Sequence, residues 1–115
     1  MGLIKKLDGV KATMLISSVD GAPINSILPG GINESRYAAM TIAMFSMMER
    51  VCIETNKGKF KFCYIEGEDG KLLLISLNKG LILSISFDST INNERVFTTY
   101  IKIIDLISDS LSDLI

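Results

Sequence analysis

One long apolar helix, expected over residues 33–55, constrains the fold of this chain more than any other part of its sequence. At 100° per residue, most of its large side chains fall on one broad arc. The arc holds Tyr37, Met40, Met44, Phe45, Met47, Met48, Val51 and Cys52. Other apolar residues lie opposite, and a helix that is apolar nearly all round is buried on more than one side. In so small a protein, a second copy of the chain is the simplest second cover. We therefore expect self-association rather than catalysis.

Size and composition favour a single domain over residues 1–115 with a partner-covered surface. The chain has 115 residues, of which 48% are apolar, and its mean hydropathy is +0.37. The longest uncharged apolar run covers residues 37–48, well short of the roughly 20 residues that a membrane-spanning helix needs. The start of the chain lacks the long apolar region of a signal peptide. We expect no membrane span, a cytoplasmic location, and an apolar excess that is covered by a protein partner.

The charged and reactive residues argue against most catalytic and nucleic-acid-binding classes. The net charge is −1, from 12 basic and 13 acidic residues, and no basic patch suited to nucleic acid is present. The absence of histidine removes Ser-His-Asp and Cys-His catalysis and the usual zinc and iron sites. Cys52 and Cys63 lie in apolar patterns, so buried core thiols are favoured over a redox pair. We expect no catalytic residue, no metal and no cofactor.

The remaining patterns give the order of the elements. Strands are expected over residues 12–19 and 22–28 around the Asp20-Gly21 hairpin turn. Because Pro23 cannot donate to a ladder on both sides, its strand should lie at a sheet edge. Strands over 59–66, 71–77 and 81–87 follow the long helix, with Phe60, Phe62 and Tyr64 expected on one face. A final helix begins at Asn92 or Asn93 and presents one apolar face, which includes Val96, Phe97, Tyr100, Ile101, Ile103 and Ile104. With a short helical turn near Leu7, the order is (α)ββαβββα.

Three segments together resemble one known family. They are residues 10–24 around the Asp-Gly hairpin, residues 36–40 (Arg-Tyr-Ala-Ala-Met) at the start of the long helix, and residues 64–75 around Gly67-Glu68-Asp69-Gly70. In this order and spacing they resemble the roadblock domain, the family of dynein light chain roadblock and of MglB-like prokaryotic proteins. The resemblance implies an α/β (α+β) fold with a five-stranded antiparallel sheet, order 2-1-5-4-3, sandwiched between helices. It also implies a homodimer in which the third strands pair and the long helices meet across a two-fold axis.

The resemblance further implies a non-enzymatic homodimeric scaffold that binds a small Ras-like GTPase, to activate or to anchor it. In the MglB-like case the dimer would position the GTPase's own residues without donating an arginine finger. The expected dimer interface contains Tyr37, Met40, Met44, Met47, Met48, Phe60, Phe62 and Tyr64. Weaker candidates for partner contacts are Arg36, Glu49 and Arg50. The alternative is a small-molecule sensor with a profilin-like or PAS-like sheet, in which the methionines line a ligand pocket. An enzyme ranks lowest.

Overall fold

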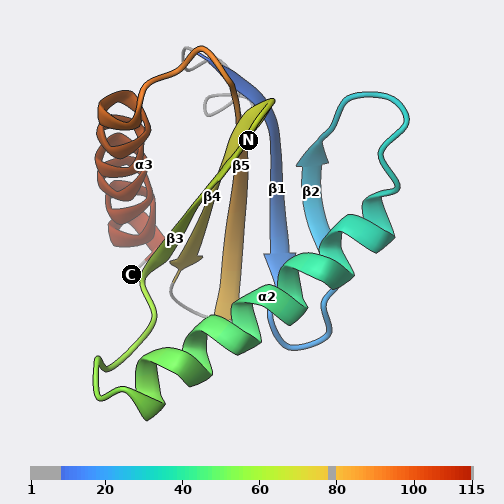
Figure 1. The fold of residues 1–115 in the computed structure, drawn as a ribbon. Coiled ribbons are helices and arrows are strands. Elements are labelled where there is room, and N and C mark those ends of the chain that lie inside the picture. The colour runs from blue at the N-terminus through green and yellow to red at the C-terminus, as the bar shows by residue number, and fades with distance from the viewer. Residues whose placement is uncertain (1–8, 78–79, 115) are drawn as a thin grey trace.

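The computed structural model describes residues 9–77 and 80–114 of the chain (Figure 1). The expected turn near Leu7 lies outside these residues. The elements are β1 (Val10–Ser17), β2 (Pro23–Ile27), α2 (Glu34–Glu54), β3 (Phe62–Gly67), β4 (Gly70–Leu77), β5 (Leu81–Asp88) and α3 (Asn93–Leu114). Among them the two-strand, helix, three-strand, helix order agrees with the sequence analysis.

The five strands form one antiparallel sheet in the order β2-β1-β5-β4-β3. This is the order that the family resemblance implied. The Pro23 strand, β2, lies at one edge, as the missing N–H of proline required. Strand β3 forms the other edge and pairs only with β4 among the described residues.

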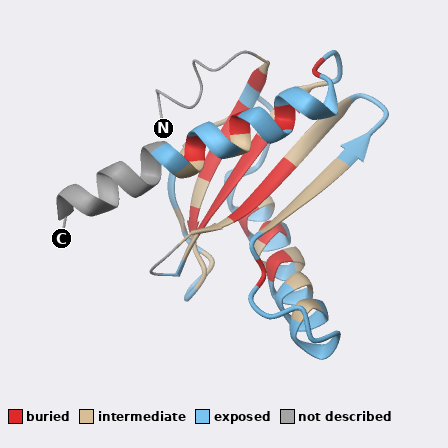
Figure 2. Cartoon of the chain, turned by 90° about the vertical axis from the view of Figure 1, so that its left-hand side faces the viewer, coloured by how far each residue is buried: buried red, intermediate tan, exposed pale blue. Residues whose placement is uncertain are grey.

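Helices cover both faces of the sheet, so the protein has two apolar layers (Figure 2). Strand β5 shows why both faces need a cover, because its successive side chains point to opposite faces of the sheet and include apolar residues on both. Leu83, Ile85 and Phe87 join the core under α3. Ile82 lies in the core under α2. In β4 the three consecutive residues Leu73, Leu74 and Ile75 are fully buried, as expected for a strand covered on both sides.

Helix α2 begins and ends where local side-chain chemistry predicts. The Asn33 side-chain oxygen accepts a hydrogen bond from the Arg36 N–H at 2.9 Å, which caps the first turn. At the other end Asn56 adopts φ 60°. The Asn56 N–H donates to Ile53 O at 3.1 Å and the Lys57 N–H to Cys52 O at 2.7 Å, the two bonds of a Schellman C-terminus.

The expected strand over 59–66 is partly wrong, because β3 starts only at Phe62. Phe60 therefore does not share a face with Phe62 and Tyr64. Phe60 lies in the core under α2, where its ring packs edge-to-face on the Phe45 ring with 5.6 Å between the ring centroids. Phe62 and Tyr64 pack on the α3 side. Residues 59 and 60 precede the strand, although Lys61 O still accepts a ladder hydrogen bond from the Ser76 N–H. The two-residue alternation therefore does not extend back to Phe60.

Candidate functional site

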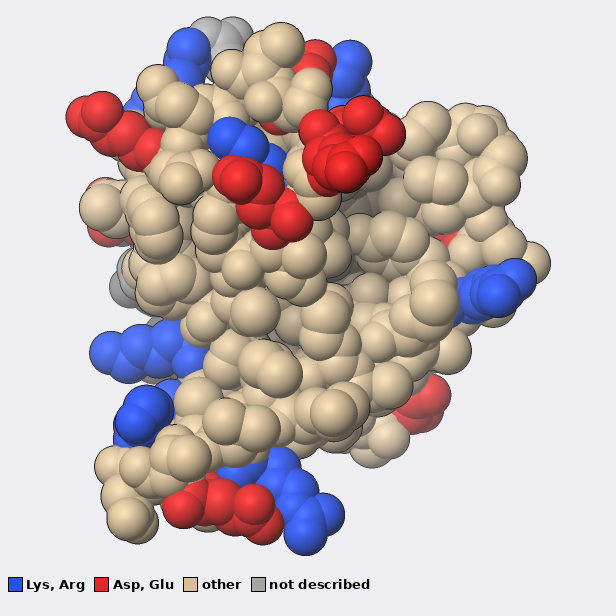
Figure 3. Space-filling model, in the orientation of Figure 1, with Lys and Arg blue, Asp and Glu red and all other residues tan. Residues whose placement is uncertain are grey.

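Helix α2 carries an open apolar stripe, the Met flank, formed by Met40, Met44, Met47 and Val51. At 100° per residue these four side chains fall within about 60° of one another. Met40, Met47 and Val51 are 57%, 64% and 50% exposed, whereas Met44 is half-buried. Figure 3 shows uncharged atoms over most of the visible side of α2, with charged side chains toward its ends. The chain by itself therefore leaves one side of α2 uncovered.

The other expected interface residues of α2 and its loop are held inside the chain to different degrees. Tyr37 is half-buried, and its hydroxyl lies 2.8 Å from the Ser84 hydroxyl of β5. Burial raises the pKa of the Tyr37 phenol. Met48 packs against the core under α2, and Phe60 is 8% exposed. These side chains attach α2 to the sheet and support the Met flank from beneath.

Strand β3 offers an open edge for pairing. The Ser76 N–H donates to Lys61 O at 2.9 Å, and the register pairs Cys63 with Leu74 and Ile65 with Leu72. Hydrogen-bonded pairs alternate along an antiparallel ladder. The backbone groups of Phe62, Tyr64 and Glu66 therefore point away from β4, to the free edge. No proline interrupts this edge, so it is a template for another strand.

An aromatic cluster borders the same edge on the α3 side. The centroid of the Phe62 ring lies 4.5 Å from the centroid of the Tyr100 ring and 5.9 Å from that of the Phe97 ring. Phe97 and Ile101 are 42% and 59% exposed, so part of the apolar face of the last helix is open to solvent. Val96, Tyr100 and Ile103 of α3 pack on the core on this side of the sheet, while Phe97 contacts the rings of Phe62 and Tyr64 of β3.

Tyr64 is fixed in place by a polar group of neighbours. Its hydroxyl can donate to Glu66 Oε1 at 2.7 Å or to Asn93 Oδ1 at 2.6 Å. The Lys71 amine donates to Ile91 O and lies 3.8 Å from Glu66 Oε1. Desolvation, followed by the hydrogen bond and charge of Glu66, raises the pKa of Tyr64 to about 12. The phenol therefore stays neutral, and it links the edge strand to the start of α3.

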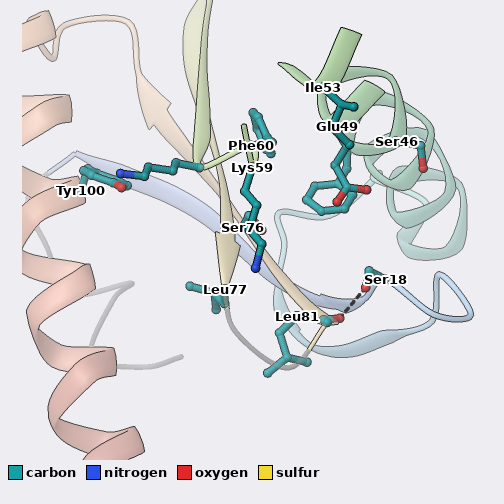
Figure 4. A pocket seen from close by; sticks show the side chains of 13 residues that line it. Ser18, Ser46, Glu49, Ile53, Lys59, Phe60, Ser76, Leu77, Leu81 and Tyr100 are labelled. Atoms are coloured by element: carbon teal, nitrogen blue, oxygen red, sulfur yellow. Dashed lines mark hydrogen bonds between the residues drawn. The ribbon is translucent and has the colours of Figure 1, made fainter. Parts of the chain in front are cut away.

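The opposite flank of α2 borders a cleft of about 680 Å³, here called the α2 cleft (Figure 4). Its apolar wall contains Phe45, Ile53, Phe60, Leu77 and Leu81, and its polar groups come from Ser18, Ser46, Glu49, Lys59, Lys61, Ser76 and Tyr100. No methionine lines it. The alternative of a methionine-lined pocket therefore does not describe this cleft. Sequence reasoning missed the α2 cleft because its walls come from five separate segments of the chain.

The three residues suggested for partner contacts are not brought together. Arg50 Nε pairs with Glu54 Oε1 at 3.0 Å on the exposed surface of α2. Glu49 faces the α2 cleft. Arg36 is exposed in the first turn of α2, and its backbone N–H donates to the side-chain oxygen of the N-cap residue Asn33.

The described residues show no arrangement suited to metal binding. They contain no group of three or more histidine, cysteine, aspartate or glutamate side chains able to hold a metal ion. Cys52 and Cys63 are free and half-buried, and burial raises the pKa of the Cys63 thiol. A thiol with a raised pKa is a poor nucleophile at neutral pH. Within the described part of the chain, no helix is both long and apolar enough to cross a membrane.

The fold and the sequence agree with one family model. The Roadblock/LC7 domain model matches residues 1–87. The chain belongs to the Roadblock/LC7 family. Three uncharacterized proteins of Methanocaldococcus jannaschii, MJ0310, MJ1340 and MJ0714, are each 33% identical to it over 89 residues. That match spans 77% of this chain and 76% of MJ0310.

Solved structures of Roadblock/LC7 and MglB proteins share the architecture. Myxococcus xanthus MglB superposes with a TM-score of 0.86 at 18% identity, over 98% of this chain and 85% of MglB. A Roadblock/LC7 domain from Streptomyces avermitilis gives 0.78 at 14% identity, over 96% and 92%. The resemblance drawn from the three sequence segments is thus confirmed, as is the sheet order that it implied. Roadblock/LC7 proteins are regulatory and scaffold domains, generally non-enzymatic, and the MglB-like fold is associated with GTPase regulation.

Proposed function

We propose that this Roadblock/LC7 chain is a cytoplasmic, prokaryotic, non-enzymatic homodimer that binds and regulates a small Ras-like GTPase. The observation that carries the proposal is the Met flank together with the open β3 edge. Both are surfaces that a monomer leaves uncovered, and large exposed apolar patches on globular proteins usually mark contact sites.

The two surfaces belong to elements that share one core layer, the core under α2. Met44, Met48 and Cys52 of α2 pack on the same core as Cys63 of β3. A two-fold axis beside β3 would pair the outward backbone groups of Phe62, Tyr64 and Glu66 with those of the second copy. It would also bring the second α2 against the Met flank. In this arrangement Met40 and Met47 make direct contacts, Met44 and Met48 contribute their exposed parts, and Tyr37 and Phe60 hold the interface from within.

The GTPase part of the proposal draws on the family and its fold. A dimer of this kind presents two α2 helices side by side, each with Arg36 and Arg50 on its exposed surface. These arginines are our candidates for contacts with the GTPase. Glu49, which lines the α2 cleft, is the third candidate. Regulation would then act by positioning residues that the GTPase itself supplies.

The first experiment measures molecular mass by light scattering over a dilution series of the wild type, Met47→Glu and Ile53→Glu. Met47 and Ile53 are 64% and 65% exposed, so neither change should disturb the monomer fold. Met47→Glu should give a monomer, because it would bury two unpaired carboxylates at the two-fold interface. Ile53→Glu, on the opposite flank of the same helix, should remain a dimer. A wild type that is monomeric at all concentrations would refute the dimer.

The second experiment tests the partner. Small GTPases encoded near this gene are mixed, in their GTP and GDP forms, with the wild type and with Met47→Glu. The wild type should co-elute with one GTPase in one nucleotide state and change its rate of GTP hydrolysis, and the monomeric variant should do neither. Equal effects of the two proteins would separate GTPase binding from dimerisation and contradict the proposal.

A further inference from the structure

We propose that the α2 cleft binds a small organic anion with an apolar body, such as a carboxylate or phosphate ester on an aliphatic chain. The inference does not depend on the dimer or on the GTPase, because it concerns the other flank of α2. Around the helix axis, the mean direction of Phe45, Glu49 and Ile53 lies about 170° from the mean direction of the Met flank. A partner seated on the Met flank therefore leaves this flank of α2 free, while Lys61 and Tyr100 in the opposite wall lie next to the β3 edge.

The charge of the cleft favours an anion. Lys59 and Lys61 both line it, and neither forms an ion pair with another described residue. Figure 4 shows the Lys59 side chain extending across the cleft toward Ser76 and Leu77. Glu49 is the single carboxylate in the lining, so the two amines outweigh it. Charge-assisted hydrogen bonds from an ammonium group to a carboxylate or phosphate are stronger than neutral ones.

The floor of the cleft favours an apolar body on that anion. Phe45 and Phe60 are 7% and 8% exposed and meet edge-to-face, so they form a fixed aromatic surface. Ile53 is 65% exposed at the mouth and offers further apolar contact. The opposite corner is closed by Ser18, whose hydroxyl donates to Gly80 O at 2.8 Å.

The size of the cleft indicates a small molecule rather than a protein surface. Its volume of about 680 Å³ lies within the roughly 300–1,000 Å³ of typical ligand pockets. Its lining combines five apolar side chains with seven polar or charged ones and Gly80, so an occupant would meet both apolar surface and hydrogen-bonding groups. The combination of two unpaired amines with an aromatic floor is the basis of the assignment.

The test uses the full-length ¹⁵N-labelled protein and three probes that share one eight-carbon chain. Octanoate and octyl phosphate carry the anion, and octylammonium carries the opposite charge. Octanoate or octyl phosphate should shift the amide signals of Ser46, Lys61, Ser76 and Gly80. Octylammonium should bind about tenfold more weakly. The tighter of the two anions identifies the headgroup as carboxylate or phosphate.

Substitutions separate the site from general apolar association. Lys59→Gln combined with Lys61→Gln should weaken binding of the preferred anion about tenfold, and Glu49→Gln should strengthen it. Lys57→Gln is the matched control, because it removes the same charge from the same loop but lies outside the cleft lining. Met47→Glu should leave binding unchanged even where it abolishes the dimer. Equal affinity for the anions and octylammonium, or shifts confined to the Met flank, would overturn the proposal.

Discussion

The Tyr37 hydroxyl of α2 and the Ser84 hydroxyl of β5 lie 2.8 Å apart, with Ser84 only 1% exposed. This hydrogen bond joins the long helix to the central part of the sheet inside an otherwise apolar layer. Because Ser84 is buried, the loss of its partner leaves a desolvated hydroxyl without compensation. The pair therefore fixes where α2 lies on the sheet, and hence where the Met flank points.

We expect Tyr37→Phe to lower the free energy of unfolding by about 1–2 kcal/mol, since it removes one partner of a buried hydrogen bond. Chemical denaturation of Tyr37→Phe, Ser84→Ala and the double variant measures this cost. The two single effects should not add, because either change breaks the same bond. Strict additivity would show that the two hydroxyls do not interact.

The amides of β3 should report the proposed dimer directly. In the wild type we expect slow hydrogen exchange at Phe62, Tyr64 and Glu66, whose N–H groups point to the free edge and would pair with the second copy. In Met47→Glu these amides should exchange fast, while Cys63 and Ile65, which point to β4, stay protected. Exchange measured by NMR distinguishes the two sets, and fast exchange at the edge amides of a dimeric wild type would place the interface elsewhere.

Removal of the α2 cap should destabilise the protein without altering its fold. Asn33→Ala deletes the oxygen that accepts the Arg36 N–H bond, and loss of such a cap typically costs about 1 kcal/mol. Asn33→Asp keeps an acceptor at the same position and should retain the stability of the wild type. Thermal and urea denaturation of the two variants provide the comparison, in which an equal loss for both would exclude capping as the cause.

Tyr64 should make stability depend on pH in the alkaline range. Its pKa is about 12 in the folded chain against an ordinary value of 10.0, so the neutral phenol is favoured by folding. This contribution is complete below the unfolded pKa and is lost as the pH rises from 10 toward about 12. Urea midpoints measured across this interval should fall more steeply for the wild type than for Tyr64→Phe. Parallel curves for the two proteins would contradict the shift.

Several elements could be predicted because their signals are local. The limits of the long helix, expected at residues 33 and 55, and the edge position of the Pro23 strand depend on backbone groups in or next to those residues. The alternation of side chains between the two faces of β5 can be predicted from that strand alone, because it requires only that both of its faces are buried. The sheet order needed more than these rules, and it came from the resemblance of three segments to the Roadblock/LC7 family.

Where the rule of alternation was extended past the strand, it failed at Phe60. No local feature of residues 59–61 shows that Phe60 turns to the other face of the sheet, where it packs against the distant ring of Phe45. The exposure of Phe97 and Ile101 was also hidden from sequence, because it depends on which side chains of α3 the rest of the fold covers. Helical periodicity predicts the direction in which a side chain points, but not whether the neighbouring elements are wide enough to cover it.

The sequence by itself determined the element order, the limits of α2 and the excess of apolar surface on that helix. These properties follow from backbone preferences and from the spacing of residues along one segment. Only the tertiary structure decided which methionines remain exposed, that β3 keeps an open edge, and that Lys59 and Lys61 line a cleft with Phe45. Each of these depends on the packing of segments far apart in the chain, and packing of that kind is set by the whole core rather than by any single stretch of it.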